Sequence, residues 1–210
     1  MELIKIVIDF ILHIDQYLDK LIVIFHGWTY AVLFIIIFIE TGLVVMPFLP
    51  GDSLLFAAGA LTARPGSPLH IRLLYGLMVV AAVAGDTANY WIGHFLGERL
   101  SKHLKKEYLD RTHAFFEKHG GKTIFLARFV PIIRTFAPFV AGISKMTYGH
   151  FISYTIIAGI IWPAEFLFTG YFFGSVPFVQ EHFSVIAIAM IVISFIPVFF
   201  EFFKARRENK

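Results

Sequence analysis

The stretch at residues 122–146 constrains the fold of this chain more than any other. Its sequence is KTIFLARFVPIIRTFAPFVAGISKM, in which Arg128 and Arg134 interrupt an otherwise apolar run. An arginine at the depth of a bilayer is tolerated only where it faces protein, water or an opposite charge. Pro131 and Pro138 prevent one straight helix. We therefore expect broken backbone, buried inside a membrane protein, that holds two fixed positive charges against a polar cavity.

The composition places the whole chain among integral membrane proteins. Hydrophobic residues make up 58% of its 210 residues and charged residues 16%, against about 45–50% and about 25% in soluble domains. The chain has no cysteine, which excludes disulfides, thiol redox chemistry and cysteine-ligated metals. Its net charge of +3 forms no continuous basic face, so we expect no nucleic-acid partner. A single all-α membrane domain is expected over residues 1–210.

Apolar stretches divide this domain into helical segments. Residues 1–26 are amphipathic and charged, which predicts a helix at the membrane interface or against the bundle rather than a span. Residues 28–72 contain a first span and then a re-entrant hairpin, which opens with Pro47, Pro50 and Gly51 and must be covered by other helices. The remaining segments are a span at 73–97, a cytoplasmic amphipathic segment at 98–122, a second re-entrant hairpin at 123–146, spans at 148–174 and 183–203, and a cytoplasmic tail at 204–210.

The distribution of lysine and arginine sets the orientation. Seven of these residues lie in 98–122 and four in the tail, whereas the loop at 62–72 has two and the turn at 175–182 has none. Because cytoplasmic loops are enriched in lysine and arginine, the basic segment and the C-terminus are expected in the cytoplasm. The first hairpin then enters the membrane from the outer side, and the second from the cytoplasm.

The two hairpins resemble one another, which suggests an internal repeat. Pro47 is followed by an Ala-Gly pair that ends at Gly59, and Pro131 by one that ends at Gly142, with Pro138 between them. Since the hairpins are expected to enter from opposite sides, the repeat would be inverted, as in transporters whose broken helices meet near the midplane. Chance similarity between two apolar hairpins rich in proline and glycine is the alternative.

Four charged residues within the apolar segments are candidates for a transport site. Glu40, alone in the first span, is a candidate proton carrier, or else a structural salt bridge to Arg128 or Arg134. Asp52 is a natural N-cap for the second half of the first hairpin, a role compatible with titration or with binding an arginine. The two guanidinium forks suit a phosphate, which they bind bidentately and without titrating. The alternative is that they only neutralise the acids.

Further polar residues lie in the later spans. Asp86, Asn89 and Tyr90 are predicted to make supporting hydrogen bonds between helices. Glu165, two residues after Pro163, has no partner that the sequence identifies. No metal-ligand constellation, phosphate-binding loop or nucleophile motif is present, so we expect no metal, no cofactor and no enzymatic activity.

Several short motifs occur in this chain in a fixed order. They are Glu40-Thr41-Gly42, Pro47-Phe48-Leu49-Pro50-Gly51-Asp52, Gly85-Asp86 with Tyr90, Gly93 and Gly97, Arg128-Phe129-Val130-Pro131-Ile132-Ile133-Arg134, and Pro138 with Ala141-Gly142. In these motifs, and over residues 1–203, the sequence resembles the DedA family of bacterial inner-membrane proteins, of the SNARE-associated or VTT-domain superfamily. The resemblance is closest to the member that gives the family its name.

This resemblance implies paired re-entrant hairpins and a role in moving lipids across the membrane. It also implies a link to recycling of undecaprenyl phosphate and to phospholipid movement, with dependence on the proton gradient. The acids that the family requires match Glu40 and Asp52, and its required arginines match Arg128 and Arg134. The expected location is the bacterial inner membrane.

The leading hypothesis is a proton-gradient-dependent translocase for undecaprenyl phosphate or a related anionic phospholipid. Arg128 and Arg134 would bind the lipid phosphate, while Glu40 and Asp52 would take up protons and release the arginines. One alternative is a proton-coupled transporter for a small ion or a drug. Another is a membrane scaffold whose charges only hold the bundle together. A homo-oligomer is left open.

Overall fold

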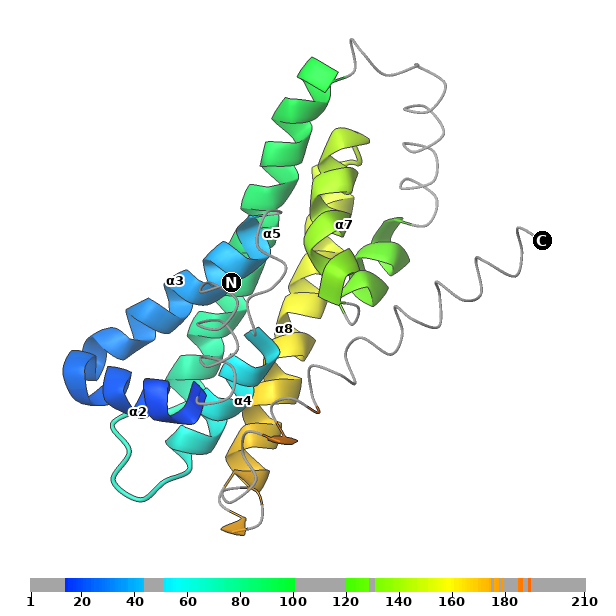
Figure 1. Ribbon diagram of the computed structural model, residues 1–210. Helices are drawn as coiled ribbons and strands as arrows, with labels where there is room; N and C mark the ends of the chain where they lie inside the picture. The colour runs from blue at the N-terminus through cyan, green and yellow to red at the C-terminus, as the bar shows by residue number, and fades with distance from the viewer. Residues whose placement is uncertain are drawn as a thin grey trace. The chain divides into compact units, whose positions relative to one another are not determined.

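The computed structural model describes residues 14–43, 51–100, 120–128 and 131–174, with a few isolated positions between 176 and 189. All elements in this part of the chain are helices (Figure 1), as predicted. They are α2 (Ile14–Phe25), the 3-10 helix η1 (His26–Trp28), α3 (Thr29–Gly42), α4 (Gly51–Thr62), α5 (Ile71–Leu100), a short helix at residues 120–127, α7 (Pro131–Ile143) and α8 (Tyr148–Phe173).

Two of these helices are long and apolar enough to cross a membrane. They are Ile71–Gly97 within α5, with 27 residues, and Tyr148–Phe173, with 26. At about 1.5 Å per residue, each is longer than a hydrocarbon core of about 30 Å. They coincide with the spans predicted at 73–97 and 148–174.

Other predicted segments are described only in part. α2 forms the second half of the helix predicted at 1–26, and it buries Leu18 while Tyr17 is exposed, as expected of an amphipathic helix. α3 has 14 residues and ends at Gly42, so it covers only the first part of the predicted span. Outside the described residues lie Pro47, Pro50, most of the basic segment at 98–122, nearly all of the span at 183–203, and the tail.

Contacts between the helices divide the chain into two compact units. The first comprises Met1–Phe34, Pro50–Met78 and Pro163–Lys210, and the second comprises Ile35–Leu49 and Val79–Trp162. Each unit packs one short helix against part of a long one: α4 against α8 in the first unit, and α7 against α5 in the second.

In the first unit, α4 is almost completely enclosed. Every residue from Gly51 to Leu61 is buried, as expected if this helix belongs to the predicted hairpin, which other helices would have to cover. α4 contacts α2, and its backbone lies directly against the backbone of α8. A Cβ atom added at Gly59 would stand 2.1 Å from the carbonyl oxygen of Leu167, so only glycine fits there.

In the second unit, α7 lies equally close to α5. A Cβ atom added at Gly142 would stand 2.0 Å from the carbonyl oxygen of Tyr90. One added at Gly93 would stand 2.1 Å from the carbonyl oxygen of Phe139. Small residues that let two backbones approach are the usual basis of helix association in membranes.

The two helix pairs make these contacts in the same register. In the first unit, Gly59 meets Leu167, Gly170 meets Phe56, and Gly174 meets Ala60. In the second unit, Gly142 meets Tyr90, Gly93 meets Phe139, and Gly97 meets Ile143. One constant shift in residue number relates α4 to α7 throughout, and a second relates α8 to α5. This agreement supports the internal repeat that the two Ala-Gly pairs suggest, while its inverted orientation stays a prediction.

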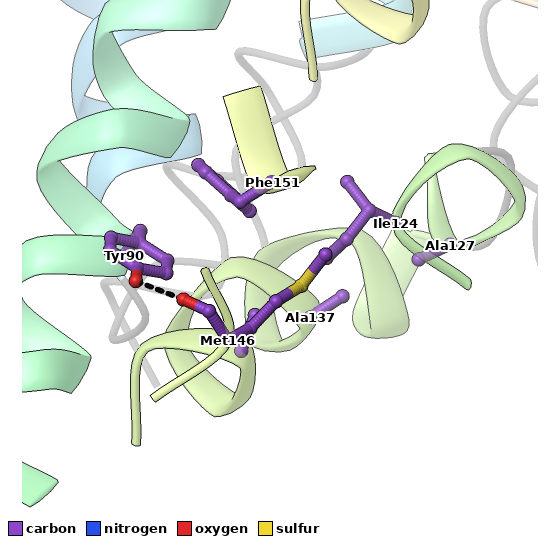
Figure 2. Close-up of a cluster of buried hydrophobic side chains, with 7 residues drawn as sticks. Tyr90, Ile124, Ala127, Ala137, Met146 and Phe151 are labelled. Carbon is purple, nitrogen blue, oxygen red and sulfur yellow. Dashed lines mark hydrogen bonds between the residues drawn. The ribbon is translucent and has the colours of Figure 1, made fainter. Parts of the chain in front are cut away.

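The end of α7 is fixed by a Schellman motif. The backbone amide of Met146 donates to the carbonyl of Ala141 at 3.1 Å, and the amide of Lys145 donates to the carbonyl of Gly142 at 3.0 Å. Lys145 adopts a left-handed backbone conformation with φ 56°. The carbonyl of Met146 then accepts a hydrogen bond from the Tyr90 hydroxyl, which joins the end of α7 to α5 (Figure 2). The hydrophobic cluster around this bond also includes Ile124, Ala127, Ala137, Ala141 and Phe151.

Candidate functional site

The ion pair between Arg134 and Glu40 joins α7 to α3 inside the second unit. Nη2 of Arg134 lies 2.7 Å from Oε1 of Glu40, and the two side chains are 7% and 1% exposed. The residues are 94 positions apart in the sequence. This pair has the geometry of the salt bridge to Arg128 or Arg134 that the sequence offers for Glu40, as membrane-buried charges tend to pair.

A second buried ion pair joins Arg128 to Asp86 on α5. Nη1 of Arg128 donates to Oδ2 of Asp86, and the two side chains are 3% and 4% exposed. The sequence suggests Asp86 only as a supporting polar residue, but the structure makes it the counter-ion of one of the two arginines. Among the described residues of the second unit, two buried arginines thus each form an ion pair with one buried carboxylate.

The two carboxylates lie on neighbouring helices, Glu40 on α3 and Asp86 on α5, and these helices approach one another closely. A Cβ atom added at Gly42 would lie 3.4 Å from the Cα of Gly85. A Cβ atom added at Gly85 would collide with the side chain of Thr41, at 1.9 Å. Because these glycines lie within two residues of Glu40 and Asp86 respectively, the helix contact itself sets the place of both acids.

Asn89 on α5 forms hydrogen bonds with the backbone on both sides of the Glu40–Arg134 pair. Its amide nitrogen donates to the carbonyl of Thr41 at 3.1 Å and to that of Thr135 at 2.7 Å. Each of these residues directly follows one member of the ion pair. These two hydrogen bonds link α5 to α3 and to α7, as predicted for a polar residue between helices.

Trp162 on α8 is the residue of this site that the sequence interpretation missed. Its side chain is 1% exposed. The guanidinium carbon of Arg128 lies 4.6 Å from the centroid of its ring system, and that of Arg134 lies 5.0 Å from it. Both distances fall within the range of about 6 Å for cation–π contacts. The available signal was the position of this tryptophan deep within a span, away from the interfaces where tryptophan usually gathers.

Two of the candidate acids, Asp52 and Glu165, belong to the first unit. Asp52 is buried in the first turn of α4, one residue inside the helix that begins at Gly51, rather than at the predicted cap. A carboxylate in this turn is favoured by the helix dipole. Glu165 on α8 lies within electrostatic range of Asp52, which gives it a neighbour that the sequence did not identify. The predicted approach of Asp52 to an arginine stays a prediction.

The residues of the predicted second hairpin are described in part. Pro131 begins α7, and Pro138 lies buried inside it, one turn before Gly142. Arg128 directly follows the short helix at 120–127, whereas Arg134 lies within α7, so the two arginines come from different segments, as expected from a break near Pro131. The polar cavity stays a prediction.

These features form a charge-balanced centre with a defined chemistry. Each guanidinium presents several N–H donors in a planar fork that suits a carboxylate or a phosphate. In the described structure the forks are bound to Glu40 and Asp86. An anion that entered would have to compete with these two carboxylates.

Comparison with known proteins identifies the family. The VTT domain family matches residues 49–172, more than half of the chain. The match includes Asp52, Asp86, Arg128 and Arg134, whereas Glu40 precedes it. No solved structure matches the chain.

Curated relatives agree with this match. The chain is 51% identical over 212 residues to Protein DedA of Escherichia coli strain K12, covering 99% of the chain and 97% of that protein. It is 48% identical over 168 residues to an uncharacterized membrane protein of Mycobacterium tuberculosis strain H37Rv, covering 78% and 74%. It is 37% identical over 158 residues to the inner membrane protein YqjA of Escherichia coli strain K12, covering 72% and 70%. The chain is therefore a membrane protein of the DedA family, with its VTT domain at residues 49–172.

Proposed function

We propose that the protein is a proton-gradient-dependent lipid translocase of the bacterial inner membrane. Its substrate would be undecaprenyl phosphate or a related anionic phospholipid, and its work would support recycling of cell-envelope lipids. The observation that carries this proposal is the pair of buried arginines, each bound to one carboxylate and both against Trp162. We also propose that the two hairpins enter the membrane from opposite sides and that the C-terminus lies in the cytoplasm.

The lipid phosphate would bind by exchange with the carboxylates. Protonation of Glu40 would release Arg134, and protonation of Asp86 would release Arg128. The freed guanidinium groups would then receive the phosphate bidentately. Loss of the protons on the other side of the membrane would restore both ion pairs and expel the lipid. In this cycle Asp86 joins Glu40 as a proton-carrying residue, and Asp52 keeps its proposed role in the first unit.

Charge balance gives the number of protons. The described centre has two positive and two negative groups, and a net charge buried in a medium of low dielectric is costly. A phosphate monoester carries about −1.5 to −2 charges near pH 7. Admission of one such headgroup therefore requires the neutralisation of about two carboxylates, whereas a phosphodiester with one charge requires one. The lipid tail would remain in the bilayer throughout.

A reconstituted translocation assay tests the proposal. The purified chain in vesicles, with an imposed proton gradient, should move a labelled lipid monophosphate between leaflets. Arg134→Gln and Glu40→Gln should each abolish this movement, because one removes a fork and the other its proton switch. Arg72→Gln, at an exposed position in the first turn of α5, is the matched control and should move lipid as the wild type does.

Two results of this assay would count against a lipid translocase. Movement of the lipid by Arg134→Gln at the wild-type rate would show that this arginine does not bind the headgroup. Proton flux through the wild type without movement of any lipid would instead favour a transporter for a small ion or a drug.

A further inference from the structure

Two cations on one buried ring are unusual for a chain of this size. Significant cation–π contacts occur about once per 70–80 residues, but here Arg128 and Arg134 both lie against Trp162. The two distances of 4.6 Å and 5.0 Å to the same centroid mean that the guanidinium carbons are no farther apart than their sum. The indole thus collects two cations that come from different helical segments.

Two like charges repel one another at such a separation unless other groups hold them. The carboxylates of Glu40 and Asp86 do so in the described state. Under the proposed cycle, however, these carboxylates are neutral at the moment when the phosphate has to bind. The face of an indole carries permanent negative potential and does not titrate. Trp162 can therefore attract both guanidinium groups whether the acids are charged or neutral.

We propose that Trp162 is a positioning residue that keeps the two guanidinium groups together as one receptor for a phosphate-monoester headgroup. The indole contact follows from the geometry alone, while its use in binding a headgroup rests on the proposed function. A second charged fork held beside the first matches a headgroup that carries close to two charges. A residue that only filled space would give the arginines no such common support.

The contact is tested by the fluorescence of Trp162. The chain has 3 tryptophans, and Trp28 and Trp91 are 73% and 38% exposed, so Trp28→Phe with Trp91→Phe leaves Trp162 as the single reporter. In that background, Glu40→Gln with Arg134→Gln removes one cation together with its counter-ion and should change the emission of Trp162. An unchanged emission spectrum and lifetime would overturn the proposal.

The headgroup is tested with a soluble probe in the same single-tryptophan protein. Dihexanoyl phosphatidate, a phosphate monoester, should change the emission of Trp162, and dihexanoyl phosphatidylcholine should not. If neither lipid acts although the emission depends on Arg134, the contact stands and the lipid-phosphate function fails. If phosphatidate binds by calorimetry without any effect on the emission, the function survives and the role of Trp162 in it is overturned.

Substitutions of Trp162 separate support of the arginines from simple packing. Trp162→Leu should weaken binding of phosphatidate by about tenfold or more, because both cation–π contacts are lost. Trp162→Phe keeps an aromatic face and should recover most of the affinity. Phe151→Leu is the control, since Phe151 is as deeply buried but belongs to the cluster around Tyr90; it should lower stability and leave affinity unchanged. Equal affinities of the leucine and phenylalanine variants at position 162 would contradict the proposal, and Trp162→Phe remains informative if Trp162→Leu does not fold.

Discussion

Replacement of Glu40 by glutamine removes one charge of a buried pair and leaves the other in place. At the observed 2.7 Å between Nη2 and Oε1, the gross attraction is roughly 6 kcal/mol for an effective dielectric of about 20. Desolvation of each ion opposes this by several kcal/mol. Glu40→Gln keeps the desolvation cost of Arg134, which is 7% exposed, without the attraction. We therefore expect the free energy of unfolding to fall by about 3–5 kcal/mol.

The double variant should recover much of this loss. Arg134→Gln alone should cost a similar amount, since it leaves the Glu40 carboxylate buried without its partner Arg134. Glu40→Gln with Arg134→Gln removes both charges, so its cost should be smaller than the sum of the two by about 2 kcal/mol or more. Arg72→Gln at an exposed site should change stability by no more than about 0.5 kcal/mol.

Reversible unfolding in mixed micelles of dodecyl maltoside and dodecyl sulfate, followed by circular dichroism, measures all four variants. The reasoning would be refuted if each single substitution lowered the free energy of unfolding by less than about 1 kcal/mol and the two effects were additive. Such a result would mean that the pair is not buried as described. The exchanged pair, Glu40→Arg with Arg134→Glu, adds a functional test. A pure salt bridge tolerates this exchange, whereas a proton site at position 40 does not, so a stable variant that moves no lipid is expected.

Three further predictions concern the packing that supports the centre, each measured by thermal unfolding in detergent. Gly93→Ala places a Cβ atom 2.1 Å from a backbone oxygen of α7 and should cost about 1–3 kcal/mol; Gly76→Ala, with nothing within 4 Å, should not destabilise, and equal effects at the two sites would argue against the close helix contact. Tyr90→Phe leaves the carbonyl of Met146 without its hydroxyl donor and should cost about 1–3 kcal/mol; a neutral result would contradict that bond. Lys145→Gly relieves a left-handed backbone and should stabilise by up to about 1 kcal/mol, whereas destabilisation would show that the lysine side chain matters more than its φ angle.

The long helices and one ion pair were within reach of the sequence for physical reasons. Apolar runs of 27 and 26 residues leave few alternatives to a helix, because the backbone in lipid must satisfy its own hydrogen bonds. The pairing of an arginine with Glu40 followed from the cost of an isolated charge at that depth. Glycines such as Gly93 and Gly142 let the backbones of α5 and α7 approach closely, but their positions in the sequence do not say which helices would meet.

The choice of partners was out of reach. Acids in the apolar segments compete for two arginines, and the sequence contains no distance that would assign Asp86 to Arg128, 42 positions away. The role of Trp162 was hidden for a different reason. In a chain with 25 phenylalanines, one more aromatic residue in a span suggests contact with lipid, and only the packing of α8 shows that it faces two cations.

The shared register of the two helix pairs has an evolutionary consequence. One turn before the glycine contacts, the second unit has Asn89 bonded to the carbonyl of Thr135. The same shifts in residue number place Phe166 and Asp52 at the equivalent positions of the first unit. Duplication of an ancestral helix pair would leave this pattern: the glycines that permit close approach stayed alike, while the neighbouring position specialised. One copy has a neutral amide that links its helices, whereas the other has Phe166 at that position and the acid Asp52 at the position equivalent to Thr135.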